Sequence, residues 1–281
     1  MTLGIFAKTY QRPTLDATLD AVAAHGIHCV QFNFACCGLP TLPDTIPLEL
    51  LAMIQAELMN RQLAVAAISA TFNLIHPDPS HREAGLKRLP ELARTAQALG
   101  APMLTLCTGT RDPNDMWCAH RENSSPEAWL DLCESLELAL QLTETTGIEF
   151  GIEPELANVV DSARSCRKLL DELKSPRLRV VLDGANLLHA NDLTRQPDIF
   201  SEAFDLLGPD VSMAHAKELD AQGNPSGLAP GFGAIRWDAF FAGLHRIQFQ
   251  GPVVLHGLAE SVVPSAVQFI LNKLQSATPG A

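Results

Sequence analysis

The stretch IEFGIEPELAN, residues 148–158, joins a short apolar run to acidic residues at its end. If residues 148–153 form a strand, alternation places Glu149 and Glu153 on one face and the apolar side chains on the other. Pro154 then ends the ladder of backbone hydrogen bonds. Parallel α/β proteins place their functional side chains at the carboxyl ends of strands. Glu153 is therefore the first candidate for a functional residue, although a lone acid at such a place is more often a solvated loop residue.

Short apolar runs alternate with segments of helical period along the whole chain. The eight expected strands cover residues 3–7, 27–34, 63–70, 102–108, 148–153, 178–183, 211–216 and 252–256. The expected helices cover residues 15–24, 47–61, 82–99, 126–146, 162–173, 196–206, 237–246 and 261–274. Eight repeated βα units with no break in composition predict an α/β protein, a closed (β/α)8 TIM barrel that forms a single domain over residues 1–281. An open doubly wound sheet is disfavoured because KTYQRPT (8–14), after the first run, has no glycine-rich phosphate turn.

The composition limits the partners that the chain can have. A formal charge of -12 and a pI near 5.1 argue against a nucleic-acid backbone, which requires clustered Lys and Arg. The sequence has neither a membrane-length apolar window nor the apolar core of a signal peptide. Seven scattered cysteines without a CxxC pair indicate reduced thiols. We expect a cytoplasmic protein that acts on a small molecule, with no nucleic-acid or membrane partner and with a homo-oligomer possible.

The ends of the later expected strands carry residue types that bind metals. Asp183, His215 and His256 join Glu153 in this position, and alternation allows all four side chains to point inward. Two carboxylates and imidazole nitrogens suit a divalent ion such as Mn, Co, Zn or Mg. Each residue also has a simpler explanation, because a strand-terminal Asp often caps a turn and a lone His is often a hydrogen-bonded core residue. The four together favour a metal site.

Long connections are expected after the third, fourth and seventh strands, over residues 73–83, 109–127 and 217–236. Loops of this length in a compact domain are typically functional. On a barrel they would share the carboxyl-terminal face with the candidate ligands.

Seven motifs, in order along almost the entire chain, resemble the xylose isomerase-like TIM barrel superfamily, specifically its sugar phosphate isomerase/epimerase branch. They are TFNLIHPDP (71–79), CTGTRDPNDMW (107–117), GIEPE (151–155), VVLDGANL (180–187), HAKE (215–218), PGFGAIRW (230–237) and GPVVLHGLAE (251–260). The resemblance implies a divalent metal held by Glu, Asp, His and a second Glu, one from each of the last four strands. Glu153, Asp183 and His215 match the first three, whereas His256 stands where the second Glu is expected.

This departure affects the catalytic residues that the resemblance implies. In the epimerases that the chain resembles, the two Glu ligands are also the bases on opposite sides of the substrate carbon. Here Glu153 matches one base, and His256 is the candidate for the other, either as ligand or as proton carrier. Glu260, four residues further on, could supply the missing carboxylate. It could equally be an acid that favours the N-terminal end of the last helix.

Further candidates for binding the substrate follow the same strands, because a polyol requires several hydrogen-bonding groups at fixed places. They are Asn73, His76, His120, Glu155, Asn186 and Lys217. Each has an alternative: His76 precedes Pro77 and can form a turn, Glu155 can be solvated, and Lys217 can pair with Glu218. The segment 227–233, GLAPGFG, could offer backbone N–H groups to a phosphate or be a simple connector. No Lys or Arg cluster beside it indicates a phosphorylated substrate.

These residues favour a metal-dependent isomerase or epimerase of a small sugar or hydroxy-keto compound, which acts through proton abstraction next to a carbonyl and a metal-stabilised enediolate. A lyase or dehydratase on the same scaffold is the main alternative, because His256 departs from the expected pair of acids. An endonuclease-like metallohydrolase would need a basic DNA-facing surface, against which the acidic charge argues. A catalytically silent binding protein remains if no metal is retained.

Overall fold

The computed structural model describes residues 1–275, and its eight strands form the expected closed parallel barrel. The strands are β1 (Thr2–Phe6), β2 (Cys29–Phe32), β3 (Ala64–Asn73), β4 (Met103–Cys107), β5 (Glu149–Ile152), β6 (Leu178–Asp183), β7 (Val211–Ala216) and β8 (Pro252–Leu255). Each strand pairs with its neighbours in chain order, and β1 closes the ring against β8. The expected domain extended to residue 281, and its last six residues lie outside the described part.

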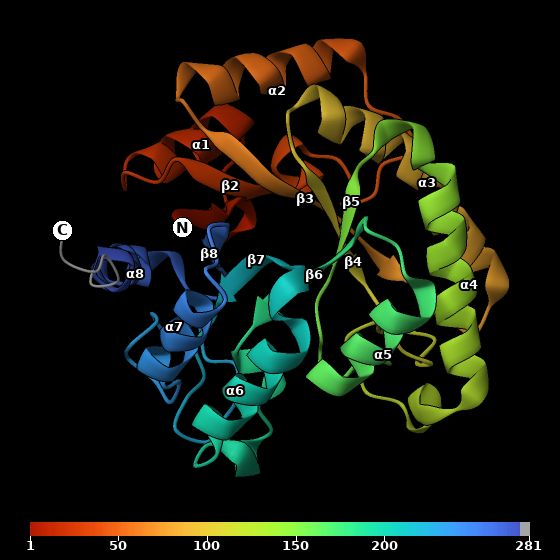
Figure 1. Ribbon diagram of the computed structural model, residues 1–281. Helices are drawn as coiled ribbons and strands as arrows, with labels where there is room; N and C mark the ends of the chain where they lie inside the picture. Colours follow the sequence, from red (N-terminus) through yellow and green to blue (C-terminus); the bar gives the residue numbers. More distant parts are fainter. Residues whose placement is uncertain (276–281) are drawn as a thin grey trace.

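Eight helices surround the strands on the outside (Figure 1). They are α1 (Leu15–Ala23), α2 (Leu48–Asn60), α3 (Pro79–Ala98), α4 (Pro126–Leu142), α5 (Ala163–Leu173), α6 (Gln196–Leu207), α7 (Trp237–Arg246) and α8 (Val263–Gln275). Local sequence begins α4, because Ser125 accepts a hydrogen bond from Ala128 N at 3.1 Å and Pro126 fits the first turn. Within residues 1–275, the helices include none with the length and apolar character needed to cross a membrane.

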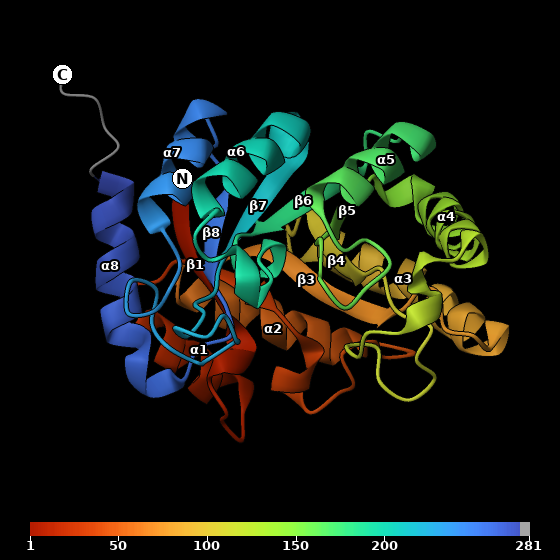
Figure 2. The same cartoon turned by 90° about the horizontal axis from the view of Figure 1, so that it is seen from below.

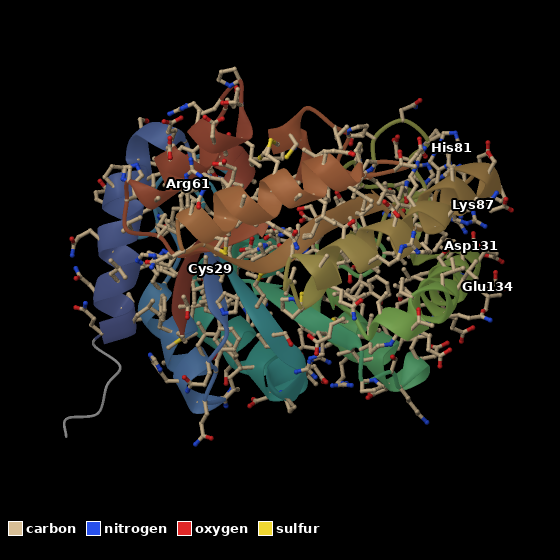
Figure 3. The ribbon with its side chains drawn as sticks, turned by 90° about the horizontal axis from the view of Figure 1, so that it is seen from above. Cys29, Arg61, His81, Lys87, Asp131 and Glu134 are labelled. Carbon is tan, nitrogen blue, oxygen red and sulfur yellow. The ribbon has the colours of Figure 1, made fainter. Side chains whose placement is uncertain are left out.

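Ion pairs join neighbouring helices on the outer surface. Arg61, which follows α2 and is labelled in Figure 3, binds Asp20 of α1 at 2.7 Å. Asp131 on α4, also labelled in Figure 3, pairs with Arg82 of α3 at 3.1 Å and with Arg111 of the β4–α4 loop at 2.6 Å. These contacts link neighbouring helices on the outside of the barrel.

Alternation along the strands determines which side chains reach the inside of the barrel. A separate cluster of Ala67, Met103, Val181, Met213 and Val254 fills its interior. Because Val181 and Met213 precede Asp183 and His215 by two residues, the same alternation directs the latter pair inward, above this cluster.

The loops that carry the site differ in length from the sequence-based expectation. The connection expected over 73–83 is shorter, because β3 extends to Asn73 and α3 begins at Pro79. Asp78 caps α3 by accepting from Ser80 N at 2.9 Å, and Pro79 occupies the first helical position. The connections after β4 and β7 are long, as expected, and lie at the same edge of the barrel (Figure 2).

A candidate metal site at the carboxyl ends of the strands

Three of the four expected ligands meet at the ends of β6, β7 and β8. Asp183 lies beside His215 in the β6–β7 register, and His256 directly follows β8. One ligand atom from each lies within 4.8 Å of the others. Asp183 and His215 are only 1% and 2% exposed. The neighbouring strands of the barrel therefore bring together residues that are 73 positions apart in sequence.

Two atoms of this trio are buried without hydrogen-bond partners among residues 1–275. Asp183 Oδ1 accepts from Ala185 N at 2.9 Å, whereas Oδ2 has no such partner and lies 3.5 Å from the Lys217 ammonium. His256 Nδ1 also has none. Buried polar atoms are seldom left without partners. These two atoms are consequently suited to bind a ligand that supplies positive charge.

The ring of His256 is held rigidly between two others. It stacks on His215 with centroids 4.7 Å apart and an angle of 6°, and on Phe6 at 5.3 Å. Burial, followed by the charge of His215, lowers the pKa of His256 to about 3. The imidazole is therefore neutral at pH 7, which is the form that binds a metal.

Glu153 lies next to the trio rather than within it. Its Oε1 lies 3.2 Å from His215 Nδ1 and accepts from Asn186 Nδ2 at 2.8 Å. Burial alone would raise the pKa of Glu153, but His215, Lys217 and His256 together lower it to about 2. Glu153 is thus a carboxylate that is ionised at pH 7, beside the three candidate ligands.

Asn186 connects this carboxylate to two further candidates. It donates to Glu155 Oε2 at 2.7 Å and accepts from Lys217 Nζ. Burial and the neighbouring charge of Glu153 raise the pKa of Glu155 to about 7. The structure therefore brings Glu153, Glu155, Asn186 and Lys217 into one network beside Asp183.

The balance of charge favours a bound cation. Three acidic side chains, Glu153, Glu155 and Asp183, lie near two groups that can carry positive charge, the buried ammonium of Lys217 and the ring of His215. Burial lowers the pKa of His215, but the charge of Glu153 outweighs this and raises it. Burial raises the pKa of Asp183 and of Glu155, and the charge of Glu153 adds to both shifts. Lys217 and His215 lower both pKa values but do not cancel the rise. A divalent cation would supply the missing positive charge, and the unpartnered Asp183 and His256 atoms are ligand types for it. The residues present therefore fit the metal that the sequence led us to expect.

A cavity of about 330 Å³ opens beside the trio. Its lining combines two acids, two imidazoles and one lysine with several uncharged polar residues and apolar side chains. The lining residues are Phe6, Lys8, Gln31, Asn33, Thr41, Ser69, Thr71, Thr105, Leu106, Cys107, Met116, Trp117, Glu153, Glu155, Asn158, His215 and His256. A cavity of this size and polarity suits a small polar molecule.

Comparison with known proteins agrees with this architecture. The family described as xylose isomerase-like TIM barrel has a model that matches residues 19–272. The chain belongs to this family. Among solved structures, D-allulose 3-epimerase from Methylomonas sp. has a TM-score of 0.74 at 16% identity, with 97% of this chain and 98% of that chain covered. The probable 3-DHS dehydratase AsbF from Bacillus anthracis has a TM-score of 0.74 at 14% identity, with coverage of 97% and 99%.

A third structure of the same fold is 3-keto-D-glucoside 4-epimerase, YcjR, from E. coli. Its TM-score is 0.76 at 14% identity, with 98% of this chain and 99% of that chain covered. At such identities the likeness establishes a shared fold.

Three expected substrate contacts have local structural roles in this member of the xylose isomerase-like family. Asn73 donates to Thr110 O at 2.7 Å and also accepts from the backbone. His76 stacks on His81 with centroids 4.1 Å apart. His120 caps a short 3-10 helix by accepting from Glu122 N at 3.3 Å. None of Asn73, His76 and His120 lines the cavity beside the trio.

The structure does not bring Glu260 to the ligands. Its carboxylate forms a bidentate ion pair with Arg12, with one contact of 2.9 Å, and the side chain is 39% exposed. The expectation that Glu260 supplies a fourth carboxylate has no support in this placement, because Arg12 already holds it at the surface. His256 occupies the position where the family resemblance implied an acid.

The Glu218 carboxylate, rather than a phosphate, accepts a hydrogen bond from the glycine-rich segment 227–233. Glu218 does not form the expected pair with Lys217. Its two oxygens accept from Gly231 N at 2.8 Å and from Ile235 N at 3.0 Å, among other donors. Lys217 turns instead toward Asp183. The backbone N–H of Gly231, in the glycine-rich segment 227–233, is consequently occupied by the protein's own carboxylate.

Sequence reasoning did not identify Gln31, which contacts the other nitrogen of His215. Gln31 Oε1 lies 2.7 Å from His215 Nε2. The available signal was a glutamine within the apolar run IHCVQFNF (27–34), where a side chain with two hydrogen-bonding groups requires a partner once it is buried.

Proposed function

We propose that the protein is a metal-dependent isomerase or epimerase of a small sugar or hydroxy-keto compound. The observation that carries the proposal is the trio of Asp183, His215 and His256, with its two unpartnered buried atoms. Two of the trio, His215 and His256, line a cavity that Glu153 and Glu155 also line. The epimerases of the same fold support this class of reaction.

Asp183, His215 and His256 would hold the divalent cation, with Glu153 adjacent. When bound, such a cation polarises a carbonyl and a neighbouring hydroxyl and so stabilises negative charge on their oxygens. The two carboxylates that line the cavity, Glu153 and Glu155, are the groups available to remove a proton next to that carbonyl.

The other cavity residues would orient the substrate. Asn158, Thr105 and Ser69 offer uncharged hydrogen-bonding groups suited to hydroxyls. Trp117 and Met116, from the long β4–α4 loop, cover the cavity with apolar surface. Such cover reduces the access of water to the reacting carbon.

A lyase, specifically a dehydratase, is the second candidate, and the arrangement of acids favours it. Both cavity carboxylates, Glu153 and Glu155, belong to β5 or the loop that follows it, whereas the β8 side presents His256. Epimerisation requires proton transfer on both faces of one carbon, while loss of water needs only one base and one acid. AsbF, the probable 3-DHS dehydratase, has the same fold.

One experiment separates these functions. The protein would be purified, loaded with Mn²⁺ or Co²⁺, and incubated in D₂O with a panel of ketoses and hydroxy-keto acids while NMR follows the substrate. An isomerase or epimerase incorporates deuterium at the carbon next to the carbonyl, and a dehydratase releases water to form an alkene. Glu153→Gln is the control and should abolish either signal. If no substrate exchanges and no metal binds, the proposed function is wrong.

A further inference from the structure

Gln31 is the one residue on the β1–β4 half of the barrel whose side chain hydrogen-bonds a candidate ligand, among the hydrogen bonds of residues 1–275. It is 4% exposed and lies on β2. The pairing of β2 with β3 shifts register between Val30 and Gln31. Irregularities of this kind redirect a side chain and are frequent beside active sites. The long side chain of Gln31 therefore reaches across the barrel interior to His215 on β7.

The Gln31 amide has contacts at both of its ends. Its Nε2 donates to Ser69 Oγ at 3.3 Å on β3 and to Thr105 Oγ1 at 3.4 Å on β4. Its Oε1 then faces His215 Nε2 at 2.7 Å. An amide oxygen has no proton to donate, so the proton in this hydrogen bond must belong to the imidazole.

We propose that Gln31 is a positioning residue that sets the tautomer of His215. By accepting the Nε2 proton of the neutral ring, it leaves the lone pair of Nδ1 available to a metal. A neutral imidazole has one N–H and one lone pair, and the hydrogen bond at one nitrogen determines which atom can bind a metal. This inference rests on the metal-dependent function proposed above.

The opposite orientation of the Gln31 amide would place the proton of His215 on the other nitrogen. If Gln31 donated to Nε2, the proton of His215 would lie on Nδ1 and would bind Glu153 Oε1, 3.2 Å away. His215 and Glu153 would then form a pair that needs no cation, and Nδ1 could not be a ligand. The position of a single proton distinguishes the two arrangements.

The test is NMR of protein labelled with ¹⁵N in its nine histidines, recorded without metal at a pH at which the His215 ring is neutral. His215→Gln identifies the relevant signals by their loss. We expect the proton on Nε2 in the unmodified protein and in Gln31→Glu, which keeps an oxygen acceptor at the same reach. In Gln31→Met, which has no such acceptor, we expect the proton to move to Nδ1, facing Glu153.

Zinc affinity, measured by competition with a chelating dye, supplies the second readout. Gln31→Met should weaken Zn²⁺ binding by about 10–100-fold, as is typical when a residue that orients a ligand is lost, and Gln31→Glu should restore most of it. The exposed Gln97 provides the matched control, because Gln97→Met should change neither readout. A role confined to packing would lower the melting temperature of Gln31→Met without moving the proton.

Two results would overturn the inference. One is an Nδ1 proton on His215 in the unmodified protein, and this measurement needs no variant to fold. The other is a folded Gln31→Met that keeps both the Nε2 proton and its zinc affinity. Failure of the proposed function is separate, because it would show as absent metal binding in the unmodified protein whichever nitrogen carries the proton.

Discussion

Asp183 and Glu218 are two buried carboxylates, each 1% exposed, yet their surroundings differ. Both oxygens of Glu218 are saturated by donors within the protein, namely the backbone N–H groups of Leu219, Gly231 and Ile235 and the indole of Trp237. Asp183 has one oxygen without a hydrogen-bond partner among residues 1–275. Burial alone thus does not identify a functional acid. An oxygen left without a donor indicates a group that binds something from outside the chain.

Substitution of the two acids should separate activity from stability. Asp183→Asn is expected to reduce turnover more than about 100-fold, because even residues that only orient a metal ligand are worth 10–100-fold. It should leave the free energy of unfolding of the metal-free protein unchanged or higher, since burial already disfavours the Asp183 charge. Steady-state kinetics and urea unfolding measure both effects. If Asp183→Asn keeps the activity of the unmodified protein, Asp183 is not part of the site.

Glu218→Ala should show the converse pattern. Loss of this carboxylate leaves four donors in the β7–α7 loop without an acceptor, and hydrogen bonds to a charged group contribute roughly 1.5–3 kcal/mol each. We expect the free energy of unfolding to fall by about 3 kcal/mol or more, measured by urea titration. The fraction that remains folded should keep zinc affinity within a few fold of normal. A large loss of affinity without loss of stability would reverse the assigned roles of the two acids.

The pH dependence of stability tests Glu155, which is intermediate between Asp183 and Glu218. Glu155 accepts a hydrogen bond from Asn186, but its pKa is raised to about 7. A carboxyl group with a raised folded pKa stabilises the protein fully below its unfolded pKa of about 4.5 and loses that contribution as pH rises through about 7. Glu155→Gln should therefore be more stable than the unmodified metal-free protein at pH 8, by roughly 1–3 kcal/mol. The difference should vanish near pH 4.5. If Glu155→Gln and the unmodified protein differ in free energy of unfolding by the same amount at every pH, the raised pKa of Glu155 is contradicted.

The smallest effect is expected for Glu260, which is paired with Arg12 at the surface. Glu260→Gln should change turnover less than about twofold and the free energy of unfolding by less than about 1 kcal/mol, as is typical of exposed ion pairs. Kinetics on the deuterium-exchange substrate would measure the first. A loss of turnover comparable to that of Asp183→Asn would restore Glu260 to the catalytic set.

Periodicity predicted the barrel well, because each βα unit buries its own apolar stripe and the units repeat. The strand ends at Asp183 and His215 follow directly from alternation, and the structure places both together. The bounds of β3 were less predictable, since its extension to Asn73 depends on pairing with Cys107 of β4. The local sequence pattern does not determine such contacts between strands.

The roles of individual polar residues were the least predictable part. His76 and His120 have the residue type of a substrate ligand, but their partners are a neighbouring ring and a helix end. Gln31 was missed because its partner, His215, is 184 residues away in sequence. Which polar groups are saturated within the chain, and which are left for a ligand, emerges only when the barrel closes.

The most direct test of the account is the anomalous difference density of a crystal soaked in Mn²⁺. The account predicts one strong peak within coordination distance of the Asp183, His215 and His256 side chains, with the unpartnered Asp183 Oδ2 among its ligands. A well-diffracting crystal with no peak at this trio, or with manganese bound only elsewhere, would contradict it.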